Sequence, residues 1–313
     1  MYDVHTHFVP APVMEWVRAE AATIRAVFER RDPTKAEFLV VNGKWGFELK
    51  PTFIDAEGYL QAQAAAGVTY ALVSPIPQLF AYEFEPAVTE ALASVYNQAL
   101  VEWVAQHPDR LGALATVPLN APERAATLLE AALDRGLLGA IVAPGIGSRT
   151  LTDASFLPLW EVADQRRAIL FIHPLLNEDP RVQRRMMPNL IGVPWETTLA
   201  ATDLILAGYL DRFPRVRILL AHGGGFLPYQ VGRLTQGYEK WSPVRAVLQA
   251  PPEAYLQRLW YDGILWDQRS LALLAAVVGE DRVLPGSDFP FDLSVWPPRV
   301  GSDAGARQFL GRS

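Results

Sequence analysis

The first seven residues of the chain, MYDVHTH at positions 1–7, decide how the rest of the sequence is interpreted. Residues 2–4 indicate a short strand that leads directly into His5 and His7. Side chains alternate between the two faces of a strand, so these two imidazoles point the same way while Thr6 points the other. Such a pair is by itself more often an ordinary surface or core feature. Its meaning therefore depends on which other side chains the fold brings to the same point.

Composition narrows the class of protein before any further motif is considered. The chain has 313 residues, of which 50% are hydrophobic and 20% charged, which suits one domain of barrel size or two smaller ones. Its longest apolar run, residues 271–279, is too short for the roughly 20 residues that cross a bilayer. The net charge of -6 argues against nucleic acid as a partner. The absence of cysteine and of a secretory leader pattern predicts a cytoplasmic protein whose metals, if any, are held by His, Asp or Glu.

The remaining chain alternates short apolar runs with longer helical patterns. Besides the opening strand, we predict strands at residues 68–74, 111–117, 139–143, 168–173, 216–222, 259–265 and 282–288. Helices are predicted at residues 55–66, 86–106, 121–135, 156–167, 196–213, 227–240 and 268–279. Strands that are apolar throughout are typical of a parallel sheet buried on both faces. Eight such units predict a (β/α)8 TIM-type barrel rather than an open sheet, which would need a glycine-rich loop after its first strand.

One segment does not fit this alternation and is interpreted as an insertion into a single domain of residues 1–313. It covers residues 8–51, directly after the first strand. We predict a helix at residues 13–30, followed by a hairpin in FLVVNGKWGFEL at residues 38–49. Asn42-Gly43 in that stretch is a strong two-residue turn signal between alternating strands.

The barrel interpretation gives weight to the histidines, because the chemistry of such barrels lies at the carboxyl ends of the strands. His5 and His7 end the first predicted strand, His173 the fifth, His222 the sixth, and Asp288 the eighth. The remaining histidine, His107, instead ends a predicted helix, where contact with the helix dipole accounts for it. Three imidazoles and a carboxylate suit one divalent transition metal.

We therefore assign His5, His7, His173 and Asp288 to the metal and leave His222 as the acid or base beside it. The end of the fourth predicted strand decides how many metals are expected. Two-metal barrels of this type usually bridge their ions there with a modified lysine, whereas this chain has Ala143. The sequence predicts a single ion, with zinc expected and manganese as the alternative.

Four longer motifs carry a resemblance to a known family: DVHTHFVP at residues 3–10, FIHP at 171–174, AHGGGFLPYQVGR at 221–233 and GSDFPF at 286–291. They resemble the amidohydrolase superfamily, and within it the branch of aminocarboxymuconate-semialdehyde decarboxylase and related decarboxylases of aromatic acids. This resemblance implies a metal-dependent barrel, in most cases a nonoxidative decarboxylase, and a homodimer. It also implies the same four ligands, with His222 as the catalytic histidine.

The resemblance also implies two substrate-binding cations. Arg233 lies where the decarboxylases place an arginine that reaches across a dimer interface, and Lys50 takes the place of a second arginine in the inserted segment. Lysine keeps the charge but loses the bidentate fork of arginine. Each residue is also compatible with an ordinary surface cation. Asn189 stands near the position of an aromatic gate, which predicts a pocket shaped for a different acid.

The expected function is nonoxidative decarboxylation of an unsaturated or aromatic carboxylic acid, a small-molecule substrate. In this interpretation metal-bound water, His222 and Asp288 handle the proton that replaces the lost CO2. The alternative is a hydrolase in which the same metal activates water against an ester, lactone or amide. Neither nucleic acid nor a membrane is expected as a partner.

Overall fold

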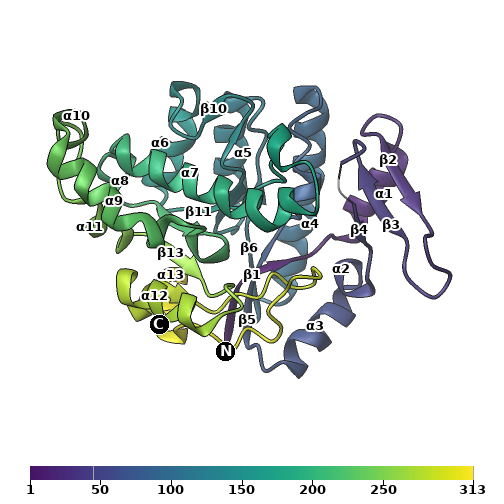
Figure 1. The fold of residues 1–313 in the computed structure, drawn as a ribbon. Helices are drawn as coiled ribbons and strands as arrows, with labels where there is room; N and C mark the ends of the chain where they lie inside the picture. The colour runs from purple at the N-terminus through teal and green to yellow at the C-terminus, as the bar shows by residue number, and fades with distance from the viewer. Residues whose placement is uncertain (45, 313) are drawn as a thin grey trace.

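A computed structural model describes residues 1–44 and 46–312 of the chain (Figure 1). Its centre consists of short parallel strands with helices packed outside them. The central strands are β1 (Tyr2–His7), β5 (Tyr70–Ser74), β6 (Leu111–Ala113), β7 (Ala115–Thr116), β8 (Gly139–Val142), β11 (Ile169–Ile172), β12 (Arg217–Leu220), β13 (Trp260–Asp262) and β14 (Val283–Leu284). Every residue of β5, β8 and β11 is buried, which is expected for a parallel sheet that is covered on both of its faces.

The strands are ordered β1-β5-β6 in one sheet and β7-β8-β11-β12-β13-β14 in the other, and all their pairings are parallel. Only Leu114 separates β6 from β7 along the chain. At the other end, the segment after β14 lies beside β1. The amide of Val4 donates to the carbonyl oxygen of Pro285 and that of His7 to Phe289, each over 2.8 Å. The segment that follows the last central strand therefore runs beside the first.

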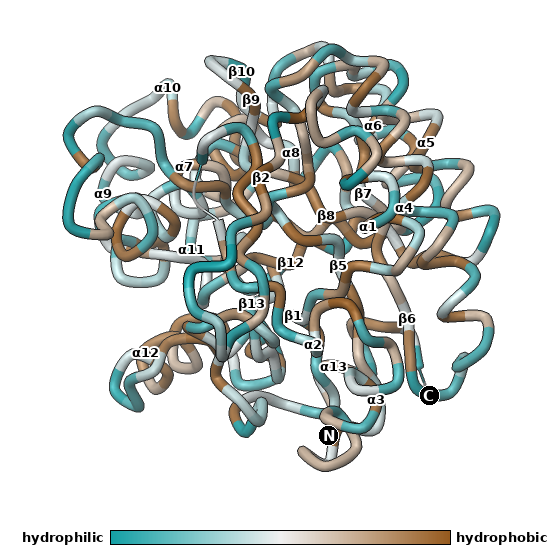
Figure 2. Tube along the Cα trace, turned by 90° about the vertical axis from the view of Figure 1, so that its right-hand side faces the viewer, coloured by the Kyte–Doolittle hydropathy of each residue, from teal (hydrophilic) through white to brown (hydrophobic). Residues whose placement is uncertain are grey.

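The helices cover the outside of these strands, and Figure 2 shows hydrophobic segments concentrated in the central strands. The long helices follow the strands in the chain and are α3 (Ala56–Ala65), α4 (Pro86–Gln106), α5 (Pro122–Asp134), α6 (Leu157–Gln165), α7 (Val193–Leu206), α9 (Leu227–Lys240), α12 (Gln268–Val278) and α13 (Asp303–Leu310). Shorter helices are α2 (Pro51–Ile54), α8 (Tyr209–Arg212), α10 (Ser242–Arg245) and α11 (Pro252–Leu256). Among the described residues, none of the helices has the length and apolar composition that crossing a bilayer requires.

The segment after β1 differs from its predicted structure. Helix α1 spans Ala11–Ala19, so the helix predicted at residues 13–30 was wrong in its second half. Arg25 has a φ of 48°, which helical backbone does not allow, and residues 26–29 form strand β2 (Ala26–Glu29) instead. The reason is pairing with a distant segment, because β2 runs antiparallel to β3 (Phe38–Val41).

Strand β3 in turn pairs with β4 (Phe47–Glu48), and the chain between them contains Asn42 and Gly43 with φ of 54° and 64°. Positive φ at both residues is what the Asn-Gly turn signal requires. Trp45, within the predicted hairpin, lies outside the described residues. The resulting three-stranded sheet lies to one side of the central strands, beside α1 (Figure 1).

Two elements in the carboxyl-terminal half of the chain also end before their predicted boundaries. The helix predicted at residues 196–213 is divided, because Gly208 with a φ of 72° separates α7 from α8. The last predicted strand, residues 282–288, is a strand only at Val283–Leu284. Pro285 has no amide to donate, and Asp288 has a φ of 60°, so the chain bends where the predicted strand ends.

The close packing of β8 against β11 gives a stability prediction for Gly139→Ala. A Cβ atom at Gly139 would lie 1.9 Å from the carbonyl oxygen of Ile169 in the paired strand. We expect the free energy of unfolding to fall by about 3 kcal/mol because the strands must separate locally. Gly232→Ala in α9, where the added methyl has nothing within 4 Å, should be neutral or slightly stabilising. Chemical denaturation of both variants is the measurement, and equal stabilities would contradict this account of the packing.

Candidate active site

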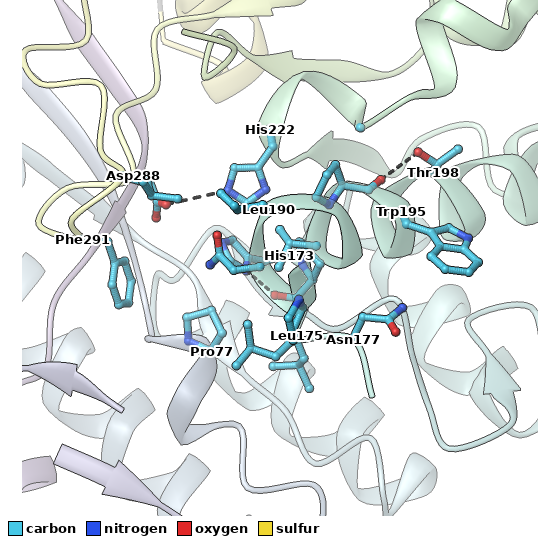
Figure 3. A pocket seen from close by; sticks show the side chains of 18 of the residues that line it. Pro77, His173, Leu175, Asn177, Leu190, Trp195, Thr198, His222, Asp288 and Phe291 are labelled. Atoms are coloured by element: carbon cyan, nitrogen blue, oxygen red, sulfur yellow. Dashed lines mark hydrogen bonds and ion pairs between the residues drawn. The ribbon is translucent and has the colours of Figure 1, made fainter. Parts of the chain in front are cut away.

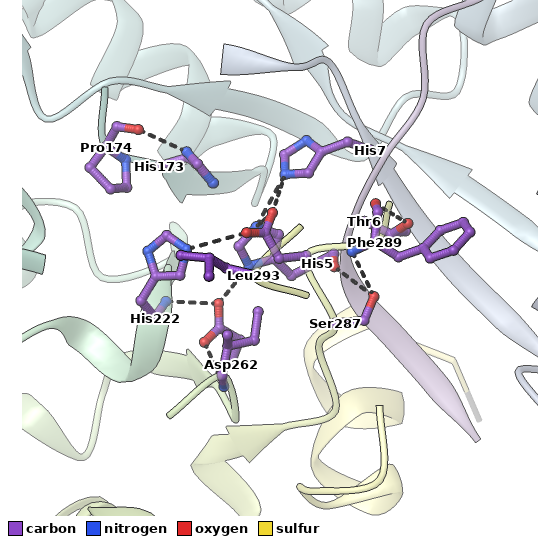
Figure 4. Close-up of polar contacts among 12 residues, drawn as sticks. His5, Thr6, His7, His173, Pro174, His222, Asp262, Ser287, Phe289 and Leu293 are labelled. Carbon is purple, nitrogen blue, oxygen red and sulfur yellow. Dashed lines mark hydrogen bonds and ion pairs between the residues drawn. The ribbon is translucent and has the colours of Figure 1, made fainter. Parts of the chain in front are cut away.

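Strand β1 places His5 and His7 at the centre of the fold, fully buried (Figure 4). The Nδ1 atom of His5 lies 2.6 Å from Oδ2 of Asp262, and Nδ1 of His7 lies 3.1 Å from the carbonyl oxygen of Pro75. These partners accept a hydrogen bond from the Nδ1–H group, which leaves Nε2 of each ring as the free nitrogen. The two Nε2 atoms are 3.2 Å apart. The alternation predicted for this strand therefore holds for its two histidines.

His173 and Asp288 reach the same point from the ends of other strands. Nδ1 of His173 lies 3.0 Å from the carbonyl oxygen of Pro174, so its Nε2 is also free. Oδ1 of Asp288 lies 3.3 Å from Nε2 of His5 and 3.1 Å from Nε2 of His7. One potential ligand atom from each of the four residues lies within 4.8 Å of the other three. The structure thus brings together the four residues that the sequence assigned to the metal.

Among the described residues, Nε2 of His173 is buried without a hydrogen-bond partner, and Oδ1 of Asp288 has only its ion-pair contacts with His5 and His7. Buried polar atoms without a partner are costly and call for a ligand. Burial lowers the pKa of His173 well below its usual range, so this imidazole is neutral and keeps a lone pair. Three imidazole nitrogens and a carboxylate oxygen are a donor set typical of a divalent transition metal. A single divalent metal fits these residues.

The electrostatics of the cluster also favour a cation. Burial opposes a charge on His5, yet the carboxylates of Asp288 and Asp262 raise its pKa to about 10. Burial likewise opposes ionisation of Asp288, but the charge on His5 holds the pKa of that carboxyl well below its usual range. Two carboxylates thus lie at the centre, and a metal ion can supply the balancing positive charge in place of the proton on His5.

His222 lies beside this cluster, at the start of the short 3-10 turn η5 (His222–Gly224) that follows β12. Its Nε2 atom is 3.7 Å from Oδ2 of Asp288, while its Nδ1 atom is buried without a partner. Glycines 223–225 continue the turn with φ of 61°, 76° and 65°. A Cβ at Gly225 would lie 2.1 Å from the carbonyl oxygen of Pro194, so close approach of two backbones requires glycine there.

Asp262 is a functional residue that the sequence reasoning did not identify. It is fully buried at the end of β13, and its Oδ2 accepts hydrogen bonds from Nδ1 of His5 and, over 2.9 Å, from the amide of His222. Its Oδ1 accepts from the amides of Gly223 and Ile264 over 2.9 and 3.2 Å. One carboxylate thus orients a metal ligand and the turn that carries His222. The rule used for the histidines, a polar residue at a strand end, did not select Asp262 because the predicted strand continued to residue 265, whereas β13 (Trp260–Asp262) ends at Asp262 itself.

Asp3 was missed as well, because it precedes the histidines in the same strand. It is fully buried and accepts hydrogen bonds from the hydroxyl and amide of Ser287 over 2.6 and 3.1 Å. Burial raises the pKa of Asp3 to about 7 although these hydrogen bonds oppose the shift. The pair attaches the segment that carries Asp288 to β1.

Both predicted substrate-binding cations lie away from the cluster. Nζ of Lys50 is 2.6 Å from Oδ1 of Asp292 and 3.1 Å from the carbonyl oxygen of Pro290. Arg233 is exposed on α9. Neither belongs to the described residues that line the cavity over the cluster, whereas Asn189 does. Their role in substrate binding stays a prediction.

That cavity has a volume of about 1840 Å³ and is bordered by His173, His222 and Asp288 (Figure 3). The fully buried His5 and His7 lie behind them. Residues from the loops after several strands form its walls, among them Leu175. A cavity of this kind, over a cluster of titratable and metal-ligating groups, is the arrangement expected of an enzyme active site.

The geometry agrees with the comparison to known proteins, in which the amidohydrolase family pattern matches residues 2–308. The chain belongs to the amidohydrolase family. The 2-amino-3-carboxymuconate-6-semialdehyde decarboxylase of Dictyostelium discoideum is 28% identical over 300 residues, which cover 95% of this chain and 83% of that protein. The resemblance recognised from the four motifs is thereby confirmed.

Two solved structures share this amidohydrolase fold. The 5-carboxyvanillate decarboxylase of Sphingomonas paucimobilis has a TM-score of 0.83 at 21% identity, covering 100% of this chain and 99% of that one. A dihydroxybenzoic acid decarboxylase from Polaromonas sp., solved with bound manganese and the inhibitor 2-nitroresorcinol, has a TM-score of 0.74 at 17% identity. The match covers 99% of this chain and 96% of that one. These likenesses confirm the predicted α/β architecture with parallel strands.

The unpartnered Nε2 of His173 leads to a prediction on metal content. We expect the purified protein to carry about one equivalent of divalent metal and His173→Ala to lose most of it, because the donor set falls from four to three. His107→Ala, at the end of α4, should retain the metal. Elemental analysis of both folded variants is the measurement. Equal metal content in the two would remove His173 from the site.

A second prediction concerns Asp262→Asn, which keeps the shape but presents an amide nitrogen where a carboxylate oxygen now accepts hydrogen bonds. We expect the affinity for the divalent metal to fall about 10- to 100-fold because His5 loses its orienting partner. Asp134→Asn is the matched control, since Asp134 is exposed and, within residues 1–44 and 46–312, pairs only with Arg166, at 2.7 Å. Competition with a chromophoric chelator measures both affinities. An unchanged affinity in Asp262→Asn would contradict the orienting role.

Proposed function

We propose that this protein is a metal-dependent nonoxidative decarboxylase of an unsaturated or aromatic carboxylic acid. The observation that carries the proposal is the convergence of four ligand atoms from His5, His7, His173 and Asp288 within 4.8 Å, with His222 beside them at the cavity. The acids named for its relatives, a carboxymuconate semialdehyde among them, support this choice of substrate class.

The protein must bind one carboxylate, loosen the bond from it to the neighbouring carbon, and supply a proton to that carbon. A divalent metal, when bound, acts as a Lewis acid on substrate oxygens. His222 is placed to donate from Nε2 to the carbon as the C–CO2 bond breaks and its electron pair stays on that carbon. Oδ2 of Asp288, 3.7 Å from the same nitrogen, stabilises the protonated imidazole before the transfer.

The identity of the metal belongs to this proposal. Zinc suits three imidazoles and one carboxylate, and manganese, which the Polaromonas enzyme contains, is the alternative. His5, His7, His173 and Asp288 would hold either ion.

Lys50 and Arg233 enter the proposal as the groups that bind the reacting carboxylate. Lys50 would exchange its partner Asp292, a residue of the cavity wall, for the carboxylate of the substrate. Arg233 is exposed on α9, so its contribution requires a second subunit. We therefore propose a homodimer in which Arg233 completes the site of the partner.

The architecture proposed for this function is a closed (β/α)8 barrel in one domain of residues 1–313. The hydrogen bonds that join Val4 to Pro285 and His7 to Phe289 support closure between the first and last strands. We interpret residues 8–51, with α1 and the three-stranded sheet, as an insertion after β1. A cytoplasmic location accords with a chain that has no cysteine.

The hydrolase alternative uses the same residues and is separated from decarboxylation by the product. Purified metal-loaded protein would be supplied with carboxylated catechols, resorcylates and muconate semialdehydes, and separately with aryl esters and lactones. Release of CO2 from an acid supports the proposal. Turnover of the esters and lactones alone would replace it with metal-assisted hydrolysis.

The role given to His222 predicts the behaviour of His222→Asn. We expect kcat for CO2 release to fall about 100- to 10,000-fold because no other group replaces the proton donor. Metal content should stay near that of the unaltered protein, since His222 is not among the four proposed ligands. Stopped-flow CO2 detection and elemental analysis provide the two measurements. A variant that keeps its kcat would exclude His222 as the donor.

A further inference from the structure

Gln78 is a polar residue of the cavity wall that the proposed mechanism does not use. It lies in the 3-10 turn η1 (Pro77–Leu79), which follows β5, and it lines the cavity. Among the residues that the structure describes, no group donates a hydrogen bond to its Oε1 atom, which is buried. A carboxamide oxygen in that state has lost its hydrogen bonds to water and gained none from the protein. A ligand that brings an O–H or N–H group to this atom restores the missing bond.

The turn that carries Gln78 is attached to the strand of the metal ligands. Strand β5 pairs with β1, and Ser74 at its end lies opposite His7. Pro75 follows, and its carbonyl oxygen is the atom that accepts a hydrogen bond from Nδ1 of His7. The Cα atoms of Pro75 and Gln78 are no more than about 11 Å apart, because only three residues separate them along the chain. A substituted ring with its carboxylate at the metal can therefore reach the side chain of Gln78.

The backbone around Gln78 is fixed by hydrogen bonds and by burial. The amide of Leu79 donates to the carbonyl oxygen of Ile76 over 3.0 Å, and the amide of Ile76 donates to the hydroxyl of Tyr96 over 3.2 Å. The ring of Pro77 restricts its own φ, and both neighbours of Gln78 in the turn are buried. A group that such a turn presents loses little conformational freedom when it binds a ligand, which favours a selective hydrogen bond.

We propose that Gln78 is a specificity-determining residue whose Oε1 atom accepts a hydrogen bond from a hydroxyl or amino group of the substrate. This inference rests on the proposed decarboxylation and adds a point of recognition separate from the reacting carboxylate. Gln78 selects acids that carry an O–H or N–H group over acids in which a methoxy group or a hydrogen atom takes its place. A methoxy group has no proton to donate, so its oxygen atom would lie against Oε1 without a bond.

The same hydrogen bond contributes to the reaction. His222 gives its proton to the carbon that bears the carboxylate, the C–CO2 bond breaks, and the electron pair of that bond stays on the carbon, so no oxidant or reductant is required. While the proton arrives and the bond is still partly formed, the ring carries positive charge, which a conjugated hydroxyl or amino group shares. The hydrogen of that group becomes more acidic, so its bond to Oε1 strengthens. An interaction that is stronger in the transition state raises kcat.

Binding measurements test this recognition without requiring turnover. The probes are 2-, 3- and 4-hydroxybenzoic acid, each paired with its methoxy counterpart, and calorimetry on metal-loaded protein gives their affinities. At one ring position or more, the hydroxy acid should bind about tenfold more tightly than the methoxy acid, and Gln78→Leu should reduce that preference to below about twofold. Gln61→Leu is the control, since Gln61 is exposed on α3 and lies outside the described cavity lining. Preferences that Gln78→Leu leaves unchanged at all positions would overturn the inference.

Gln78→Glu separates recognition from a purely structural role. Glutamate keeps an acceptor oxygen at the same place, so the preference for the hydroxy acid should survive in this variant. The added negative charge should weaken the binding of hydroxy and methoxy acids alike, because all of them are anions. If the Leu and Glu variants instead lose affinity equally for both members of each pair, Gln78 only supports the cavity wall and the inference fails.

Kinetics of CO2 release with the preferred hydroxy acid complete the test. Gln78→Leu should lower kcat by a larger factor than it raises KM, because the hydrogen bond is stronger in the transition state than in the bound acid. Binding preferences that depend on Gln78 while no acid is decarboxylated would support the recognition and contradict the proposed function. CO2 release with preferences that do not depend on Gln78 would support the function and overturn the inference.

Discussion

The structure depends on one constraint: each buried imidazole must place Nδ1 on an acceptor so that Nε2 is free at the centre. Asp262, the carbonyl of Pro75 and the carbonyl of Pro174 meet it for His5, His7 and His173, respectively. A buried nitrogen without such a partner would cost about 1–3 kcal/mol and would leave the ring free to rotate. These acceptors come from the ends of different strands, so only parallel strands that end at the same level can provide all three. The orientation of the site is therefore a property of the whole fold.

How much of this site could be predicted from the sequence depends on the kind of contact. His173 and His222 were identifiable because each follows a recognisable apolar strand, and the carboxyl ends of parallel strands lie together. Asp262 was not, since its role consists of hydrogen bonds to backbone amides of a turn that no local pattern reveals. The helix predicted at residues 13–30 failed for a related reason. Residues 26–29 adopt a strand because they pair with residues 38–41, and helical periodicity contains no information about a distant partner.

The two ends of the cavity differ in their electrostatics. At the buried end Asp262 and Asp288 concentrate negative charge, which favours a divalent cation and, through it, an anionic substrate group. At the open end the carboxylates of Glu178 and Asp292 are already paired with lysines. A lysine that is paired with a nearby acid attracts an incoming anion weakly, because the anion must first displace that acid. The acids of the open end thus already have partners, whereas those of the buried end are left for a cation to balance.

This difference bears on how substrates can be inferred within the family. Identity of 28% to a decarboxylase is compatible with a common metal end, since the ligand geometry tolerates little change, but says nothing of loops that face solvent. Leu190 and Leu199 lie on such a loop and the helix after it, where an apolar residue has no structural reason to be more than half exposed. A side chain in that position gains favourable free energy only when something covers it. The strand ends thus provide the proposed metal ligands, whereas the segments around the cavity provide its exposed apolar side chains.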